Sequence, residues 1–88
     1  MDYHHFINQL SDLNPEAVFF DNMDAAIVGI GRIGGDDPVP VYSKSKIYEK
    51  LLADGFSLED AHEYYSGKFL ALRAGAATPV IIEDLPQE

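Results

Sequence analysis

The fold of this chain depends on residues 25–42, which read AAIVGIGRIGGDDPVPVY. Residues 25–30 form a short apolar run with β-branched side chains and no polar face, which predicts a buried strand. Residues 34–38 (GGDDP) have the composition of a turn, and an apolar pattern resumes over residues 39–42. The two runs predict an antiparallel β-hairpin. Because proline has no N–H to donate to a neighbouring strand, Pro40 predicts that the second strand lies at an edge there.

The segments around this hairpin predict helices. Apolar residues at helical spacing predict a first helix over residues 2–13. Asn14 followed by Pro15 is a helix-start signal, which predicts one further turn over residues 17–20, with a short strand as the alternative. Ser43 is expected to cap a helix that runs to Asp54. Ser57 is expected to cap the next helix, which ends before Gly75 and whose apolar stripe consists of Leu58, Ala61, Tyr65, Phe69 and Leu72.

Residues 78–82 predict a last strand, started sharply by Pro79. We expect it to pair beside residues 25–30, because the most apolar strand is expected at the centre of the sheet. The fold class expected is α+β, with a small three-stranded, mainly antiparallel sheet and about three helices packed on it.

Length and charge limit the classes of function. The 88 residues suffice for one small domain, residues 1–88, in which residues 85–88 are expected to form a free tail. The formal net charge is −9, so we expect no direct binding to nucleic acid or to anionic membranes. The acidity could equally serve only to keep a small protein soluble. The absence of cysteine and of a secretory signal at the start leads us to expect a cytoplasmic protein.

Residues 29–34 (GIGRIG) match the dinucleotide-binding pattern G-x-G-x-x-G. That pattern needs a helix directly after the glycines, so that the helix N-terminus meets a pyrophosphate. Here a turn with Asp36 and Asp37 follows instead, and its carboxylates would repel phosphate. We therefore expect no nucleotide and no other cofactor, and we expect the glycines to serve close packing, a bulge or the hairpin turn.

No set of residues predicts catalysis or a metal site. His62-Glu63 begins like the zinc-protease motif H-E-x-x-H, but Ser66 stands where the second histidine would be. Glu59, one helical turn before His62, is the expected partner of that imidazole. The acidic clusters in turns lack the spacing of a calcium loop. We expect no catalytic residue and no metal ligand, and hence a protein that is not an enzyme. Three lysines on the helix after Ser43 suggest a small anion patch, or simply a solvated helix face: Lys44, Lys46 and Lys50.

Several motifs occur in a fixed order along residues 20–82. Asp24 leads the strand that ends in the Gly-x-Gly-Arg-x-Gly sequence of residues 29–34, and a Val-Tyr strand and a Thr-Pro strand start follow at residues 41–42 and 78–79. In this order the chain resembles a family of small phage-encoded proteins of unknown function, and it departs from their pattern at residues 66–73. The resemblance implies the α+β fold and a phage origin, hence the cytoplasm of a host cell, but no activity. The helix-start residues that also match are Gly55, Ser57, Glu59, Ala61 and Glu63.

These observations predict a small acidic accessory protein of phage type that binds a host or phage protein, as an inhibitor or as a mimic of nucleic acid. The alternatives are a small-molecule or nucleotide binder that uses the loop between Gly29 and Gly35, and a virion or assembly component. A homodimer is also expected, because a three-stranded sheet leaves two edges. The residues expected to meet a protein partner are Asp36, Asp37, Tyr42, Tyr48 and Tyr64.

Overall fold

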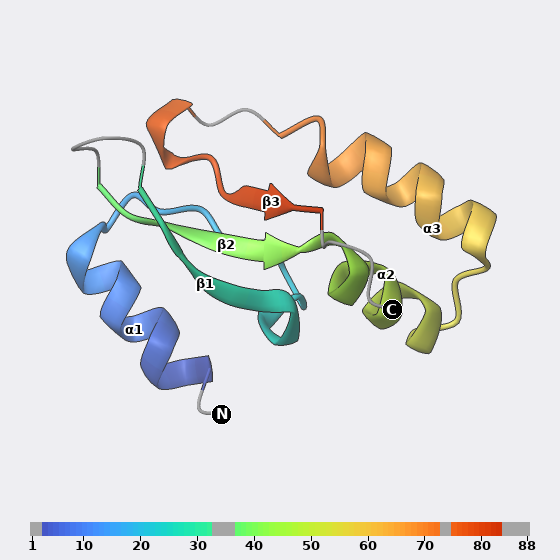
Figure 1. Cartoon of the computed structure of the whole chain (residues 1–88), viewed down its shortest axis with the longest axis horizontal. Coiled ribbons are helices and arrows are strands. Elements are labelled where there is room, and N and C mark those ends of the chain that lie inside the picture. The colour runs from blue at the N-terminus through green and yellow to red at the C-terminus, as the bar shows by residue number, and fades with distance from the viewer. Residues whose placement is uncertain (1–2, 33–36, 73–74, 84–88) are drawn as a thin grey trace.

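The structure is a computed structural model that describes residues 3–32, 37–72 and 75–83. It has the predicted α+β architecture, with helices and one small sheet whose last strand comes from the end of the described chain (Figure 1). The elements in chain order are α1 (Tyr3–Leu13), a 3-10 turn (Asp24–Ala26), β1 (Ile27–Gly31), β2 (Val39–Ser43), α2 (Lys44–Ala53), α3 (Leu58–Tyr64), a π-helical turn (Tyr65–Phe69), a second 3-10 turn (Gly75–Ala77) and β3 (Val80–Ile82).

The sheet has the strand order β1-β2-β3. β1 and β2 form the predicted antiparallel hairpin, in which Ile27 lies opposite Tyr42 and Gly31 opposite Val39. A bulge interrupts the register between Ile27 and Gly29. The prediction that the first strand occupies the centre was wrong, because β2 is the central strand. β3 pairs with β2, in parallel, and not with β1.

Pro40 explains this error. The ladder between β2 and β3 covers only Val41 to Ser43 on β2, so Pro40 has a strand partner on one side only, where it faces Ile30. The missing N–H therefore removes no ladder bond between β2 and β3, although the strand is central. Pro40 was correctly interpreted as a residue at a local edge, but it does not place the whole strand there.

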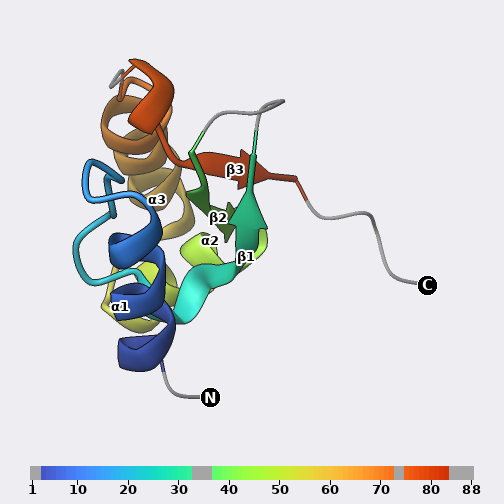
Figure 2. The same cartoon turned by 90° about the vertical axis from the view of Figure 1, so that its left-hand side faces the viewer.

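The core lies on one side of the sheet. Figure 2 shows α1 and α3 on the same side of the strands. Tyr42 of β2 is fully buried at the middle of this face, with Ile27 and Ile81 beside it on the neighbouring strands. The buried apolar side chains that surround it come from the loop before β1 and from α2 and α3, and are Phe20, Met23, Ala26, Ile47, Leu51, Ala61, Tyr65 and Phe69.

Serine caps begin α2 and α3 as predicted. The Ser43 hydroxyl accepts a hydrogen bond from the Lys46 N–H at 3.3 Å, and the Ser57 hydroxyl accepts one from the Asp60 N–H at 3.1 Å. Each bond satisfies one of the N–H groups that a helix N-terminus leaves without a partner in the helix. α2 ends at the turn that contains Gly55, whose φ of 103° lies in the region that favours glycine.

α3 does not continue as one regular helix to Gly75. It ends at Tyr64, and a wide turn follows in which the Leu70 N–H donates to the Tyr65 carbonyl at 3.1 Å. This turn lets Tyr65 and Phe69 both reach the core. Leu58 was expected in the same stripe but is 66% exposed, because it occupies the first turn, beyond the packed part of the helix.

The predicted helical turn over residues 17–20 is absent from the described structure, as is the alternative strand. Asn14 is instead buried and organises an irregular loop. Its side-chain oxygen accepts a hydrogen bond from the Glu16 N–H at 3.2 Å, and its Nδ2 donates to the Pro38 carbonyl at 2.9 Å. An asparagine that caps a helix and one that stabilises a turn use the same side-chain oxygen, so the sequence pattern does not distinguish them.

The hydroxyl of Tyr42 gives a test of this core. It accepts a hydrogen bond from the Phe20 N–H at 2.9 Å, and both groups are buried. Tyr42→Phe leaves that N–H buried without its partner, so we expect the free energy of unfolding to fall by about 1–3 kcal/mol in urea titrations. The control is Tyr48→Phe, which removes a surface hydrogen bond and should cost less than about 1 kcal/mol. Equal losses in the two variants would contradict the role given to Tyr42.

The same hydroxyl predicts how stability changes at alkaline pH. Burial raises the pKa of Tyr42 to about 12, whereas an unfolded tyrosine titrates near about 10. Between these values the unfolded chain has lost a proton that the folded chain keeps, so the free energy of unfolding falls as pH rises, by up to about 1.4 kcal/mol per pH unit from this group. The stability difference between the parent and Tyr42→Phe should therefore narrow from about pH 9 to about pH 11. A constant difference would show that Tyr42 does not titrate in this way.

Candidate functional site

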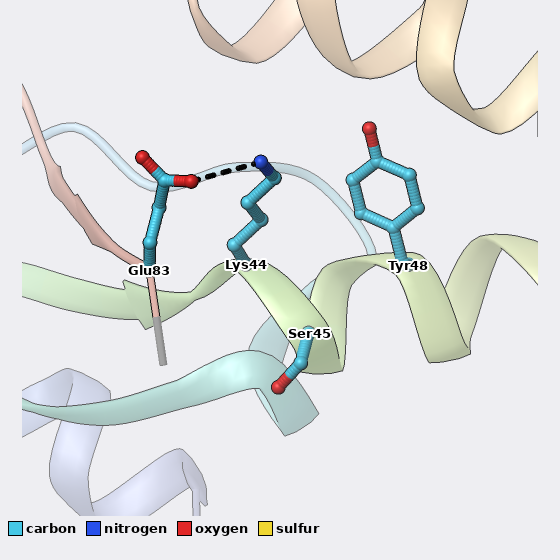
Figure 3. A pocket seen from close by; sticks show the side chains of 4 residues that line it. All are labelled: Lys44, Ser45, Tyr48 and Glu83. Carbon is cyan, nitrogen blue, oxygen red and sulfur yellow. Dashed lines mark hydrogen bonds and ion pairs between the residues drawn. The ribbon is translucent and has the colours of Figure 1, made fainter. Parts of the chain in front are cut away.

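A pocket lies where β2 ends, α2 begins and β3 ends (Figure 3). Because β2 and β3 are parallel, their carboxyl ends meet at the same edge of the sheet, where ligands often bind in parallel sheets. Ser43 both ends β2 and caps α2, so the first two turns of the helix place three side chains at this edge. Glu83 comes directly after β3. The pocket measures about 310 Å³ and is lined by Lys44, Ser45, Tyr48 and Glu83.

The charged groups of the pocket are already paired. Lys44 Nζ lies 3.0 Å from Glu83 Oε1, and this hydrogen bond is the main reason why the pKa of Lys44 is raised above its usual value. The same ammonium lies 5.5 Å from the centre of the Tyr65 ring, within the range of a cation–π interaction. The Glu83 side chain is 77% exposed, so the ion pair lies at the surface, where water screens it and it contributes little to stability.

Tyr48 lines the pocket and connects it to α3 and to the buried Tyr65. The Tyr48 hydroxyl lies 2.9 Å from His62 Nδ1, a hydrogen bond that joins α2 to α3. The rings of Tyr48 and Tyr65 lie 5.2 Å apart between centres, and burial raises the pKa of Tyr65. Glu59 was predicted as the partner of His62, but the hydrogen bond shown at that imidazole goes to Tyr48. Packing between helices therefore overrides the helical spacing.

The arrangement suits weak binding of a small polar group better than acid–base chemistry. Lys44, Tyr48 and Glu83 project to one side, whereas Ser45 points away from them (Figure 3). The Ser45 hydroxyl lies 3.1 Å from the Ser43 hydroxyl, so the pocket does not present it as a nucleophile beside a base. The Tyr48–His62 hydrogen bond is exposed to water, whereas acid–base catalysis is favoured in a site that excludes water.

A second hollow of about 390 Å³ lies elsewhere on α2, lined by Ala25, Lys46, Glu49 and Lys50. Lys50 Nζ lies 2.9 Å from Asp54 Oδ1, one helical turn further on. The anion patch suggested by the three lysines is therefore not formed. Residues two apart on a helix point in different directions, so Lys44 and Lys46 line separate hollows.

The residues predicted to meet a partner lie in different places. Asp37 is exposed just before β2, at the opposite end of this strand from Tyr48. Asp36 lies outside the described residues. Tyr64 is half-buried, with its ring 5.1 Å from Phe56 and with Lys68 Nζ 5.3 Å from its ring centre. The predicted set does not form one surface.

Tyr42 must be removed from the predicted interaction residues. It is fully buried, the centre of its ring lies 4.9 Å from the centre of the Phe20 ring, and its hydroxyl accepts a hydrogen bond from the Phe20 N–H. A polar hydroxyl on a strand residue is compatible with either surface or core, and here the core supplies the hydrogen-bond partner that burial requires.

The glycine loop proposed for a ligand is described only in part, since residues 33–36 lie outside the described residues. A Cβ at Gly31 would lie 2.9 Å from Val41 Cγ2, so this glycine serves close packing within the sheet, as predicted. The predicted bulge is also present, between Ile27 and Gly29.

The sequence analysis did not identify Glu83 as a pocket residue. Glu83 is 39 residues from Lys44 in sequence, and only the parallel pairing of β3 with β2 brings them together. The available signal in the sequence was that Glu83 is a charged residue directly after a predicted strand, where side chains often line a site at the sheet edge. Over residues 3–32, 37–72 and 75–83, no group of three or more histidine, aspartate or glutamate side chains is placed to hold a metal ion. None of the helices in these ranges has the length and apolar character needed to cross a bilayer.

Comparison of the chain with protein-family models, with curated proteins and with solved structures finds no match. The function must therefore be inferred from the residues, contacts and charges described above.

Proposed function

We propose that this protein is an accessory protein of phage type that acts by binding a host or phage protein, and that α3 presents the surface for a basic partner. The observation that carries the proposal is the exposed face of α3. Three carboxylate side chains are exposed on it: Glu59, Asp60 and Glu63. Leu58 at the start of the helix lies on the side of Ala61 but is 66% exposed, because it precedes the packed part. Exposed carboxylates on a helix, with an exposed apolar side chain at its start, are suited to a basic protein surface, in which charge steers the encounter and apolar contact prolongs it.

The packing of α3 fixes this face toward solvent. Ala61 and Tyr65 are buried in the core, so the opposite side of the helix must face water. The Ser57 cap holds the first turn, and Glu59 and Asp60 lie there, where carboxylates interact favourably with the helix dipole. The acidic groups are thus presented on a helix that is held in place before any partner binds, which lowers the entropy that binding must overcome.

The charge balance of the chain also favours a basic partner over an acidic one. The chain carries fifteen acidic and six basic residues. In the described part of the chain, Lys44 and Lys50 are paired with Glu83 and Asp54, and neither of these ion pairs involves α3. Carboxylates on α3 therefore keep their attraction for an external cation, whereas an acidic partner would meet a chain in which two of the six basic side chains are already paired.

The test compares two double variants of equal net charge. Glu59→Lys/Glu63→Lys and the control Asp12→Lys/Glu16→Lys each change the net charge from −9 to −5, since reversing two carboxylates adds four charges. Partners captured by the full parent chain from bacterial lysate at low salt are identified, purified and titrated against all three proteins. We expect the α3 variant to bind roughly tenfold or more weakly and the control to bind nearly as well as the parent. Circular dichroism confirms that the variants are folded.

Equal weakening of both double variants would show that only net charge matters and would remove α3 from the proposal. Captured partners that stay bound at high salt and bind the α3 variant as well as the parent would contradict the whole charge-driven interaction.

The pocket at α2 provides a separate test of the small-molecule alternative. Lys44→Gln, Tyr48→Phe and His62→Ala each alter groups of the pocket or its wall while leaving the carboxylates of α3 in place. If protein binding through α3 is the function, titration should show affinities within about threefold of the parent, because each variant loses only a surface contact. Loss of partner binding in all three folded variants would move the functional site to the pocket.

A further inference from the structure

β1 is an edge strand that bears no charged side chain. It is the outermost strand on the side of the sheet opposite β3 (Figure 1). Its sequence, IVGIG, has two β-branched side chains that are about half exposed, Val28 at 45% and Ile30 at 43%. Natural proteins usually protect such an edge with charges, prolines or a cover, because its free N–H and C=O groups can pair with another strand.

The other edge of the sheet is protected in these ways. β3 has only three residues, Pro79 lies directly before it and Glu83 directly after it. Shortness, a proline and a charge all discourage a further strand from pairing there. The contrast with β1 is pronounced in a chain in which fifteen of 88 residues are acidic.

Gly29 at the middle of β1 borders the bulge of this strand, but no side chain or backbone among the described residues of the same copy packs against its Cβ position. A Cβ added there would meet nothing within 4 Å, and its φ lies outside the left-handed range, so neither space nor backbone conformation requires glycine. Glycine inside a strand costs stability, and it often marks a bulge, as here, or a position where another backbone approaches closely. Gly31, by contrast, is explained by its contact with Val41.

We propose that a second copy of this chain pairs with β1, antiparallel, about a two-fold axis at Gly29. In this register Gly29 lies opposite the partner's Gly29, and Val28 lies opposite the partner's Ile30. The two half-exposed β-branched side chains of each copy then cover one another as cross-strand pairs, which is the contact that stabilises antiparallel strands. The two sheets join into one of six strands.

Charge at the two ends of β1 favours the same orientation. Asp24 precedes the strand and Arg32 follows it, and both are exposed. An antiparallel partner brings the end that carries Arg32 alongside the end that carries the partner's Asp24, twice in the dimer. A parallel partner would instead place like charges together. The apolar strand between them is the part of this acidic chain where two copies can meet with little direct repulsion.

Pairing of this kind closes on itself. The same strand serves both copies, so the edge is used up in the dimer and no filament grows from it. Five residues a side make a small contact, and two chains of net charge −9 repel each other, so we expect a dissociation constant in the range of about 10–100 μM that decreases with added salt. Binding of a basic partner by α3 should show the opposite salt dependence.

The test uses two double variants that differ from each other only at residue 30. In the proposed register, Val28→Lys/Ile30→Glu places each lysine opposite the partner's glutamate, whereas Val28→Lys/Ile30→Lys places lysine opposite lysine. Sedimentation velocity over about 1–500 μM should show dimerisation of the parent and of the Lys/Glu variant, and a dissociation constant roughly tenfold or more higher for the Lys/Lys variant. Both positions are half exposed, so the folded monomer should accept the substitutions.

A mixed sample of isotope-labelled and unlabelled parent chain gives a readout that needs no substitution. Nuclear Overhauser contacts between Val28 methyl groups of one copy and Ile30 methyl groups of the other support the register directly. A parent that stays monomeric over the whole concentration range overturns the proposal. So do equal dissociation constants for the Lys/Glu and Lys/Lys variants, or a dimer that lacks the Val28–Ile30 contacts. None of these results bears on α3, whose carboxylates are unchanged.

Discussion

The burial of Tyr42 is the constraint on which the rest of this small fold depends. Its ring lies at the centre of the sheet, and its hydroxyl holds the Phe20 backbone N–H at 2.9 Å. That bond fixes the irregular loop before β1 against β2, and Phe20 then packs on Phe69 at a ring distance of 4.5 Å. One side chain thus connects the sheet, the loop and the end of α3, and the position of α3 determines which of its side chains face water.

Ser43 links this core to the surface. It ends the strand that carries Tyr42 and caps the helix that carries Lys44 and Tyr48, so the core strand sets the direction of α2 directly. α2 in turn holds α3 through the hydrogen bond from Tyr48 to His62. A chain of this size buries only a modest core, and here the sheet and one aromatic cluster around Tyr42 form its centre.

Local signals in the sequence predicted most elements but not their arrangement. The serine caps, the hairpin and the buried face of α3 at Ala61, Tyr65 and Phe69 follow from the sequence over a few residues. The central position of β2 does not, because it depends on where β3 ends relative to Pro40. For the same reason the Lys44–Glu83 pair was not predictable, since only that parallel register brings the two residues together. Tyr42 was placed on the surface because its partner, a backbone N–H 22 residues away, leaves no mark in the sequence.

The distribution of charge separates the two surfaces that the fold leaves available. Carboxylates stand on α3, where the helix dipole and the open solvent stabilise them, and they are absent from β1, the unprotected edge of the sheet. Solubility alone would not require this division, because a charge on β1 would serve solubility as well and would also protect the edge. An uncharged edge kept beside so many acidic residues is instead what association through β1 requires. The dimer would then carry two acidic helices, so that a partner with repeated basic segments would be held by both at once, and the affinity of the pair would exceed that of either helix alone.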